Sequence, residues 1–193
     1  MSSSKPRRVT AVVCAAFDPA TDEAVLAVRD VVRSAGVRLP DRPPHRPHFS
    51  LGAARVEHGD LPRVLEVAAA VARSHRPIPV RLGEVGRFGR AGVVWLGPSP
   101  SPPALLSLQR DVDAELRAAG WPPAFGERSD PAQWIAHCTL ATRVAKPLLR
   151  KIQADLEASY RPIAATVDAL ATILVGGSGD VGHARLGADA DSG

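Results

Sequence analysis

The sequence predicts an α+β fold with two pseudo-symmetric lobes, each an antiparallel sheet with two helices, around a central cleft. Two observations support this prediction. The order strand, helix, strand, helix, strand occurs in residues 9–82 and again in residues 93–175, and one more strand follows the second copy. The middle strand of each copy carries the same short motif of histidine, any residue, a hydroxyl residue and leucine. Because the copies share this layout, we expect two similar lobes that each contribute one motif strand to the cleft.

Hydrophobic periodicity assigns the elements of the first copy. The chain opens with a continuous apolar run, which is typical of a buried strand. Valines at helical spacing follow a turn with helix-start residues, and Gly36 ends that helix. The predicted elements are a strand over residues 9–17, a helix over residues 24–34, a strand over residues 48–56, a helix that opens at residues 58–60 and a strand over residues 78–82.

Glycine and proline separate the elements of the second copy. Residues 83–90 are glycine-rich and predict a bend, and residues 97–103 are the strongest breaker in the chain. Residues 121–131 form a long loop of the kind that often carries function. The predicted elements are a strand over residues 93–96, a helix over residues 104–119, a strand over residues 134–144, a helix over residues 147–160, and a hairpin of strands over residues 166–175 and 181–186.

Composition indicates an ordinary globular protein with a mild preference for anionic partners. The 193 residues are 45% hydrophobic and 23% charged, with a formal net charge of +4. Only 4% are aromatic, which argues against a wide aromatic platform for single-stranded nucleic acid. Of the 24 basic residues only Lys5, Lys146 and Lys151 are lysines. Arginine suits phosphate binding, but we favour high genomic GC content as the explanation of this bias.

Cysteine usage and hydropathy favour a cytoplasmic protein. Cys14 and Cys138 are too few for a disulfide framework, and we expect both to be reduced core residues. No apolar run is long enough to span a membrane. Basic residues before the apolar run at 9–17 could pass for a signal peptide, but the run is short and Asp18 follows it, so a first strand is favoured.

The two copies of the short motif carry the candidate chemistry. One copy is residues 48–51 (His-Phe-Ser-Leu), and the other is residues 137–140 (His-Cys-Thr-Leu). Side chains on a strand alternate between its faces, so each histidine shares a face with the hydroxyl two residues later, while the intervening residue points into the core. Two facing strands of this kind give a site with two imidazoles and two hydroxyls, which suits a phosphate and proton transfer around it.

This pair of motifs resembles the twin H-x-[ST]-x signature of the 2H phosphoesterase superfamily, and most of all its LigT-like, or 2′-5′ RNA ligase, branch. The layout matches over residues 9–186. The resemblance implies one bilobal domain over residues 9–187. The polar segments on either side of it, residues 1–8 and 188–193, are expected to be disordered. It also implies a hydrolase that opens 2′,3′-cyclic phosphate ends of RNA or nucleotides to 2′-phosphates, and the same site could run 2′-5′ ligation in reverse.

The resemblance assigns roles to the four motif residues. One histidine takes a proton from water and the other protonates the departing ribose oxygen; we expect His137 to be the base and His48 the acid. Ser50 and Thr139 would donate hydrogen bonds to the phosphoryl oxygens. Ser50 replaces the family's commoner threonine and keeps its hydroxyl. Arg46, two residues before His48 and on the same face, would meet the phosphate, unless it is simply a solvated arginine.

Several alternatives remain open at this point. The substrate could be a small cyclic nucleotide such as ADP-ribose cyclic phosphate, or the chain could bind RNA or nucleotides without turnover. No metal or cofactor is required; a metal site of His45, His48 and His137 is disfavoured because His45 and His48 fall on opposite strand faces. Relatives often carry an arginine where this chain has Thr142. Phe88 is a candidate for stacking on a base, although core packing is the favoured role. We expect a monomer that does not bind membranes.

Overall fold

The computed structural model describes residues 7–125 and 132–187. Its elements are β1 (Arg8–Phe17), α1 (Pro19–Ser34), β2 (His48–Glu57), the short helix η1 (His58–Asp60), α2 (Leu61–Ser74), β3 (Ile78–Phe88), β4 (Val93–Pro98), α3 (Pro103–Ala118), β5 (Cys138–Ala141), α4 (Lys146–Ser159), β6 (Ile163–Leu174) and β7 (Asp180–Arg185). The predicted disordered residues 1–6 and 188–193, and residues 126–131 of the predicted loop, lie outside the described residues. Arg8, the last residue of the predicted disordered N-terminus, belongs to β1 because it pairs with Glu57.

The α+β class and the antiparallel sheet are confirmed. Every strand pair is antiparallel, and the strand order is β2-β1-β6-β3-β4-β5, with β7 paired to β6. The seven strands form one hydrogen-bonded sheet, so a division into two lobes is not a division of the sheet. The two sequence copies are also interleaved: β3 from the first copy pairs with β4 and β6, and β6 from the second copy pairs with β1 and β3.

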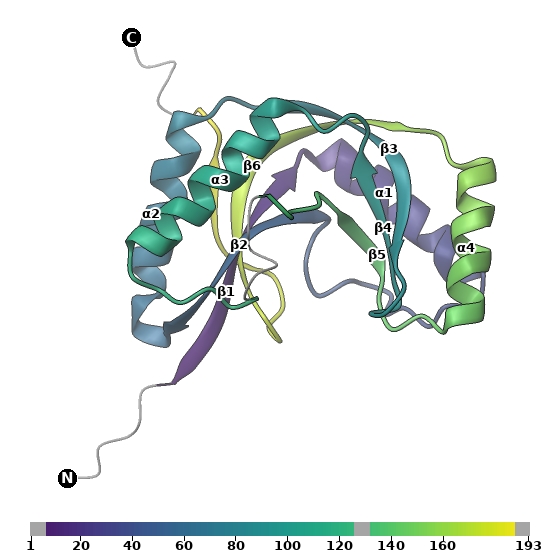
Figure 1. Ribbon diagram of the computed structural model, residues 1–193, viewed down its shortest axis with the longest axis horizontal. Coiled ribbons are helices and arrows are strands. Elements are labelled where there is room, and N and C mark those ends of the chain that lie inside the picture. The colour runs from purple at the N-terminus through teal and green to yellow at the C-terminus, as the bar shows by residue number, and fades with distance from the viewer. Residues whose placement is uncertain (1–6, 126–131, 188–193) are drawn as a thin grey trace.

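The curvature of this sheet brings its two edges together. β2 and β5, the two motif strands, are the ends of the strand order, yet they contact each other. Figure 1 shows both strands near the middle of the arched molecule. Trp134, just before β5, donates a 2.9 Å hydrogen bond from Nε1 to the Ser50 carbonyl. The site therefore depends on the whole sheet, because four other strands separate the motifs along it.

Helices pack against strands other than those they follow in the chain. α3 follows β4 in the chain but packs against β2, and α1 follows β1 but packs against β5 and β6. α2 packs against α3, β6 and β7, and α4 against β3 and β4, at the opposite end of the molecule (Figure 1). Asp18 caps the N-terminus of α1 by accepting from the Thr21 amide, and Pro19 occupies the first turn. The helix therefore begins at Pro19, five residues before the predicted start.

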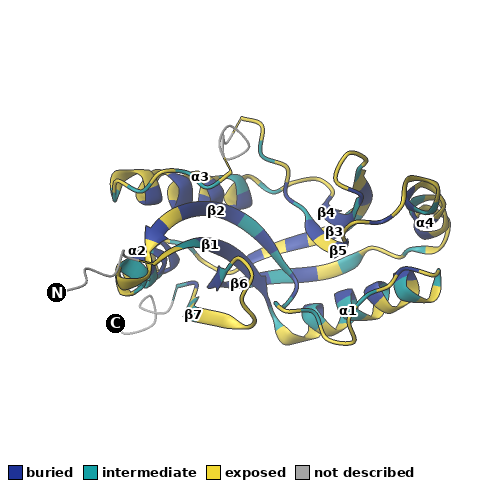
Figure 2. Ribbon diagram, turned by 90° about the horizontal axis from the view of Figure 1, so that it is seen from below, coloured by how far each residue is buried: buried dark blue, intermediate teal, exposed yellow. Residues whose placement is uncertain are grey.

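The two faces of the sheet differ in side-chain size. The main core contains the larger residues, among them Phe17, Phe49, Leu51, Leu82, Leu96 and Leu140. The other face of β1 and β6 carries mainly short side chains, namely Val12, Cys14, Ala16, Ala169, Ala171 and Ile173. Figure 2 shows β1 and β2 largely buried between the helices, whereas β7 is mostly exposed. Short side chains leave room above this face for the motif residues of β2.

The predicted glycine-rich bend at residues 83–90 is wrong. β3 continues to Phe88 and pairs with β4, with Gly86 opposite Trp95. A Cβ atom at Gly86 would lie 2.1 Å from Trp95 Cζ2, so this glycine makes space for the indole ring rather than for a turn. The predicted strand over residues 134–144 is also too long, because only Cys138–Ala141 pairs with β4. Among the described residues, no helix is long and apolar enough to cross a membrane.

Candidate active site

Strand register places the motif side chains on one face of the sheet. His48 pairs with Ala16 and Ser50 with Cys14, and directly opposed residues in an antiparallel pair share a face. Thr139 likewise pairs with Trp95. The intervening residues of the two motifs, Phe49 and Cys138, are buried in the main core, as strand alternation predicts.

Both imidazole rings are oriented in the same way. His48 Nδ1 lies 2.7 Å from the Arg46 carbonyl, and His137 Nδ1 lies 2.7 Å from the Ile135 carbonyl. A carbonyl oxygen can only accept, so in each ring Nδ1 carries the proton and donates it. In the neutral form of each ring, Nε2 is then the atom with a free lone pair. The two motifs thus repeat both a sequence pattern and a tautomer.

Contacts join the two motifs directly. The backbone of His48 hydrogen-bonds the Cys138 thiol, and the Trp134 indole donates to the Ser50 carbonyl. Burial raises the pKa of Cys138 to about 12, so this thiol is neutral and acts as a packing group. Burial also raises the pKa of Cys14, whose thiol hydrogen-bonds the Ser50 side chain. Both cysteines are unpaired and buried, as predicted.

Burial lowers the pKa of both histidines below 6.5. For His48 desolvation is the largest cause, the hydrogen bond to the Arg46 carbonyl opposes it, and the charges of His45 and His137 lower the pKa further. For His137 desolvation again dominates, opposed by the hydrogen bond to the Ile135 carbonyl. The charge of His137 thus acts on His48, across the contact between the two motif strands. At neutral pH both rings are therefore mainly neutral, and a bound anion would favour protonation of one of them.

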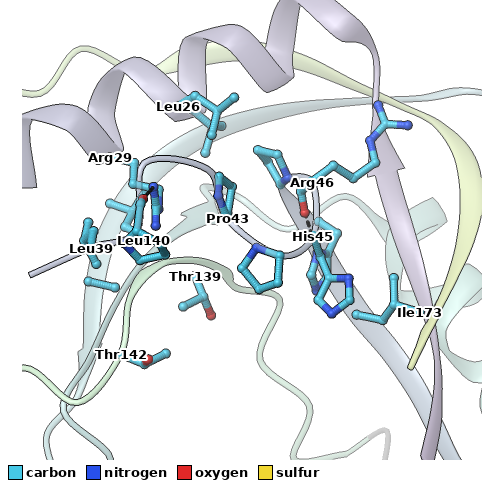
Figure 3. A pocket seen from close by; sticks show the side chains of 16 residues that line it. Leu26, Arg29, Leu39, Pro43, His45, Arg46, Thr139, Leu140, Thr142 and Ile173 are labelled. Atoms are coloured by element: carbon cyan, nitrogen blue, oxygen red, sulfur yellow. Dashed lines mark hydrogen bonds between the residues drawn. The ribbon is translucent and has the colours of Figure 1, made fainter. Parts of the chain in front are cut away.

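Arg46 is held beside His48 by an ion pair. Its Nη2 lies 2.7 Å from Asp22 Oδ2 and its Nε donates to the same oxygen at 2.9 Å. Nη2 also donates to the Phe17 carbonyl, and Nη1 lies 3.3 Å from His183 Nε2. In Figure 3 the Arg46 side chain extends away from Thr139. Burial raises the pKa of Asp22 to about 6, although Arg46 opposes this rise.

Aromatic rings surround His137 instead. The Phe88 and His137 rings pack in a T-shaped arrangement, with the centroids 4.9 Å apart and the planes at 87°. Trp95 lies 6.3 Å from the same ring and also contacts Phe88 at 5.4 Å. Phe88, the stacking candidate, therefore packs on Trp95 and also borders the site.

Two cavities flank the histidines. One, of about 390 Å³, lies between α1, the proline-rich loop before β2, and β5; His48, Arg46, Thr139 and Thr142 are among its lining residues (Figure 3). The second, of about 400 Å³, is lined by Phe88, Arg90, Ala91, Gln133, Trp134, Ile135 and His137. A phosphate at the histidines would thus have space for organic groups on both sides.

The described residues contain no group of three or more His, Cys, Asp or Glu side chains that could hold a metal ion. The alternative metal site of His45, His48 and His137 is therefore not supported; His45 instead hydrogen-bonds the Gly179 carbonyl at 3.2 Å.

Sequence reasoning missed the residues that support the site. Asp22 reads as an ordinary helix-start residue, and Trp95 and Trp134 read as strand residues. The glycine opposite Trp95 was the one available signal for a large ring at this position. Thr142 is exposed, and Arg143 has a positive φ of 57°.

Comparisons with known proteins agree with this description. The sequence model of the 2′-5′ RNA ligase superfamily matches residues 11–178. Comparison with curated proteins gives no match. Among solved structures, E. coli LigT complexed with 3′-AMP aligns with a TM-score of 0.64 and 14% identity over 93% of this chain and 99% of that chain. E. coli LigT in apo form aligns with a TM-score of 0.60 and 15% identity over 87% and 88% of the two chains, and a phosphoesterase aligns with 0.58 and 14% over 94% and 99%. At these identities the likeness shows the fold.

Proposed function

The chain belongs to the 2′-5′ RNA ligase superfamily, and on that premise we propose that it hydrolyses 2′,3′-cyclic phosphate ends of RNA or nucleotides to 2′-phosphates. Membership of this superfamily indicates a phosphoesterase. The observation that carries the finer proposal is the matched pair of imidazoles, each with Nδ1 donating to a carbonyl and Nε2 left to exchange a proton.

The proposed reaction needs one base and one acid. Neutral His137 takes a proton from water at Nε2 while the water oxygen attacks phosphorus. The bond from phosphorus to the ribose 3′ oxygen breaks, and protonated His48 gives its Nε2 proton to that oxygen. The product is a 2′-phosphate, and proton exchange with solvent restores both rings. Ser50 and Thr139 donate to the non-bridging oxygens, which stabilises the charge that develops there.

Two observations support a nucleotide substrate. Cavities of about 390 and 400 Å³ adjoin His48 and His137, so there is room for a nucleoside beside the reacting phosphate. The solved structures of E. coli LigT include complexes with 3′-AMP and with phosphate. The same cavities would also admit ADP-ribose cyclic phosphate, which is the second candidate substrate. In this scheme Arg46 is not a necessary phosphate ligand, because Asp22 and the Phe17 carbonyl already engage its guanidinium.

A product screen tests the proposal. Purified protein is incubated with nucleoside 2′,3′-cyclic phosphates, an oligoribonucleotide with a cyclic phosphate end, and ADP-ribose cyclic phosphate, each with and without EDTA. We expect 2′-phosphate products that persist in EDTA. Loss of activity in EDTA that a divalent ion restores would contradict the two-histidine scheme, and binding without turnover would support the non-catalytic alternative.

The pH dependence gives a further expectation. The base must be neutral and the acid protonated, so kcat/KM is bell-shaped between the two histidine pKa values. Since burial lowers both values, the maximum should lie below pH 6.5. Steady-state rates on a nucleoside 2′,3′-cyclic phosphate between pH 4.5 and 8.5 measure it. A maximum above pH 7 would show that the acid has a raised pKa.

A further inference from the structure

A third cavity, of about 250 Å³, has four cationic residues among its six lining residues. Its lining residues are Arg87, Gly89, Arg90, Lys146, Leu149 and Arg150. The four basic side chains are exposed, no carboxylate lines the cavity among the described residues, and none of the four makes a salt bridge within that part of the chain. A formal net charge of only +4 for the whole chain does not predict such a concentration of positive charge.

The backbone adds to the positive potential of this cavity. α4 begins at Lys146, and its N-cap residue Ala145 has no side chain that could bond the free amides of the first turn. The N-terminus of a helix carries partial positive charge and favours anions. Arg87 Nε donates to Gln153 on α4, which holds this guanidinium against the helix. The first turn of α4 thus adjoins the cavity through Lys146 and Leu149, beside the basic side chains.

Arg90 connects this basic cavity with the candidate active site. It lines the basic cavity and also the cavity of about 400 Å³ that contains Phe88, Trp134 and His137. Arg90, in the turn after β3, therefore adjoins the aromatic rings of one cavity and the other basic side chains of the second cavity. Single-stranded nucleic acids bind to such surfaces, because bases stack on aromatic rings while basic side chains follow the backbone.

We propose that the basic cavity binds the phosphate on the 5′ side of the terminal nucleotide of an RNA whose cyclic phosphate lies at His48 and His137. The terminal nucleoside then occupies the aromatic cavity. This inference rests on the proposed function and narrows its substrate class, because a mononucleoside cyclic phosphate has no group to place in the basic cavity. The chain is thus a phosphodiesterase for RNA ends.

The test compares a long and a short substrate in matched variants. The double variant Lys146→Ala, Arg150→Ala removes two charges from the basic cavity. The control Arg110→Ala, Arg161→Ala removes two exposed charges elsewhere, from α3 and from the residues after α4. For each protein, kcat/KM is measured on a tetraribonucleotide with a 2′,3′-cyclic phosphate end and on the matching mononucleoside 2′,3′-cyclic phosphate.

We expect the cavity variant to lose about 10-fold on the tetraribonucleotide, the usual worth of a charge-assisted contact to phosphate, and to keep its rate on the mononucleotide. The control should match the wild type on both substrates. The wild-type rate on the tetraribonucleotide should also fall more steeply with salt than the rate on the mononucleotide, and the cavity variant should lose this difference. Equal losses on both substrates, or no loss on either, would overturn the proposal.

Two further arms separate this inference from the proposed function. If the wild type turns over neither substrate, the proposed function fails. Fluorescence anisotropy with a labelled tetraribonucleotide 3′-phosphate then still tests the basic cavity. Weaker binding in the cavity variant alone supports RNA binding by the cavity, and equal binding in all three proteins refutes it. If the cavity variant loses its rate on ADP-ribose cyclic phosphate as strongly as on RNA, the cavity binds the diphosphate of a small nucleotide, and the assignment to RNA is wrong.

Discussion

The two motif strands place their histidines alike but support them with different chemistry. In both, Nδ1 donates to the carbonyl two residues earlier at 2.7 Å. The carbonyl below His48 belongs to Arg46, whose side chain is anchored to Asp22 of α1. The carbonyl below His137 belongs to Ile135, whose side chain is 51% exposed, and His137 itself is held by Phe88 and Trp95. The two histidines thus have the same tautomer, whereas the residues that hold each ring come from different neighbouring elements.

This difference bears on how the two halves can diverge in role. Around His48 the support is ionic, with Asp22, Arg46 and His183 in one network. Around His137 the support is apolar and adjoins the cavity with Trp134 and Arg90. A charged network can respond to pH and to a bound anion, whereas aromatic rings mainly exclude water. The proposed division of the two histidines into acid and base therefore has a structural counterpart.

The largest expected effect comes from removing either histidine. His48→Ala and His137→Ala should each lower the rate by roughly 10²–10⁴-fold, the range of a positioned acid or base. The double variant should lose less than the product of the two losses, because acid and base act as a unit. Rates on a nucleoside 2′,3′-cyclic phosphate measure these losses.

A substrate with a much better leaving group then assigns the roles, since such a group needs little help from an acid. The variant that lacks the acid should recover most of its rate, and we expect this for His48→Ala. Recovery in His137→Ala would reverse the assignment. Recovery in neither would mean that both histidines chiefly bind the phosphate.

The hydroxyls should give the next largest effect. Ser50→Ala or Thr139→Ala should lower kcat by roughly 10- to 1,000-fold, the cost of one lost donor in the transition state. Ser50→Thr keeps the hydroxyl and should retain activity. A silent Ser50→Ala beside a damaging Thr139→Ala would show that Ser50, which hydrogen-bonds the Cys14 thiol, is a structural residue.

Local patterns predicted the inner part of this site, and long-range packing determined the rest. The period of two along a strand is enough to place Phe49 and Cys138 in the core and the histidines on the other face. The meeting of β2 and β5 follows from the curvature of a sheet with four strands between them, and the spacing of the motif residues does not reveal that curvature. The pairing of Asp22 with Arg46 joins residues 24 positions apart, and the basic cavity joins β3 to α4. Such contacts depend on topology and do not appear in sequence spacing.

A smaller effect on catalysis is expected when only the ionic support of His48 is weakened. Asp22→Asn keeps the side-chain shape but removes the charge that anchors Arg46, so the Arg46 carbonyl should fix the His48 ring less firmly. We expect kcat to fall by about 10-fold with little change in KM, since a misplaced acid weakens proton transfer rather than binding. Asp30→Asn, at an exposed position of the same helix, is the matched control.

A change in KM without a change in kcat would instead assign Arg46 to phosphate binding. If Asp22→Asn releases Arg46 toward the substrate, KM should fall while kcat is kept, as the original expectation for Arg46 would require. Nitrogen-15 chemical shifts of the imidazole rings give an independent readout, because loosening the Arg46 carbonyl should reduce the Nδ1-protonated form of His48 and leave that of His137 unchanged.

The smallest expected effect is on stability rather than on rate, and it distinguishes the ionic support of His48 from the aromatic support of His137. Asp22 has a pKa near 6 in the folded protein against 3.8 for the ordinary group, and its Oδ1 is buried with no hydrogen-bond partner among the described residues. The folded state therefore binds this proton more tightly than the unfolded state does, so the resulting stability is full below pH 3.8 and is lost as the pH rises through about 6. Asp22→Asn cannot titrate. The difference in free energy of unfolding, Asp22→Asn minus wild type, should therefore increase from pH 4 to pH 7 by an amount on the order of 2 kcal/mol. Urea denaturation at several pH values measures this difference.

A gain in stability together with a loss in kcat would mean that the ionic support of His48 is retained for catalysis at the expense of stability. The aromatic support of His137 has no such cost. A difference that stays constant with pH would instead place the Asp22 carboxylate in water, and the ionic support of His48 would then be a loose surface pair.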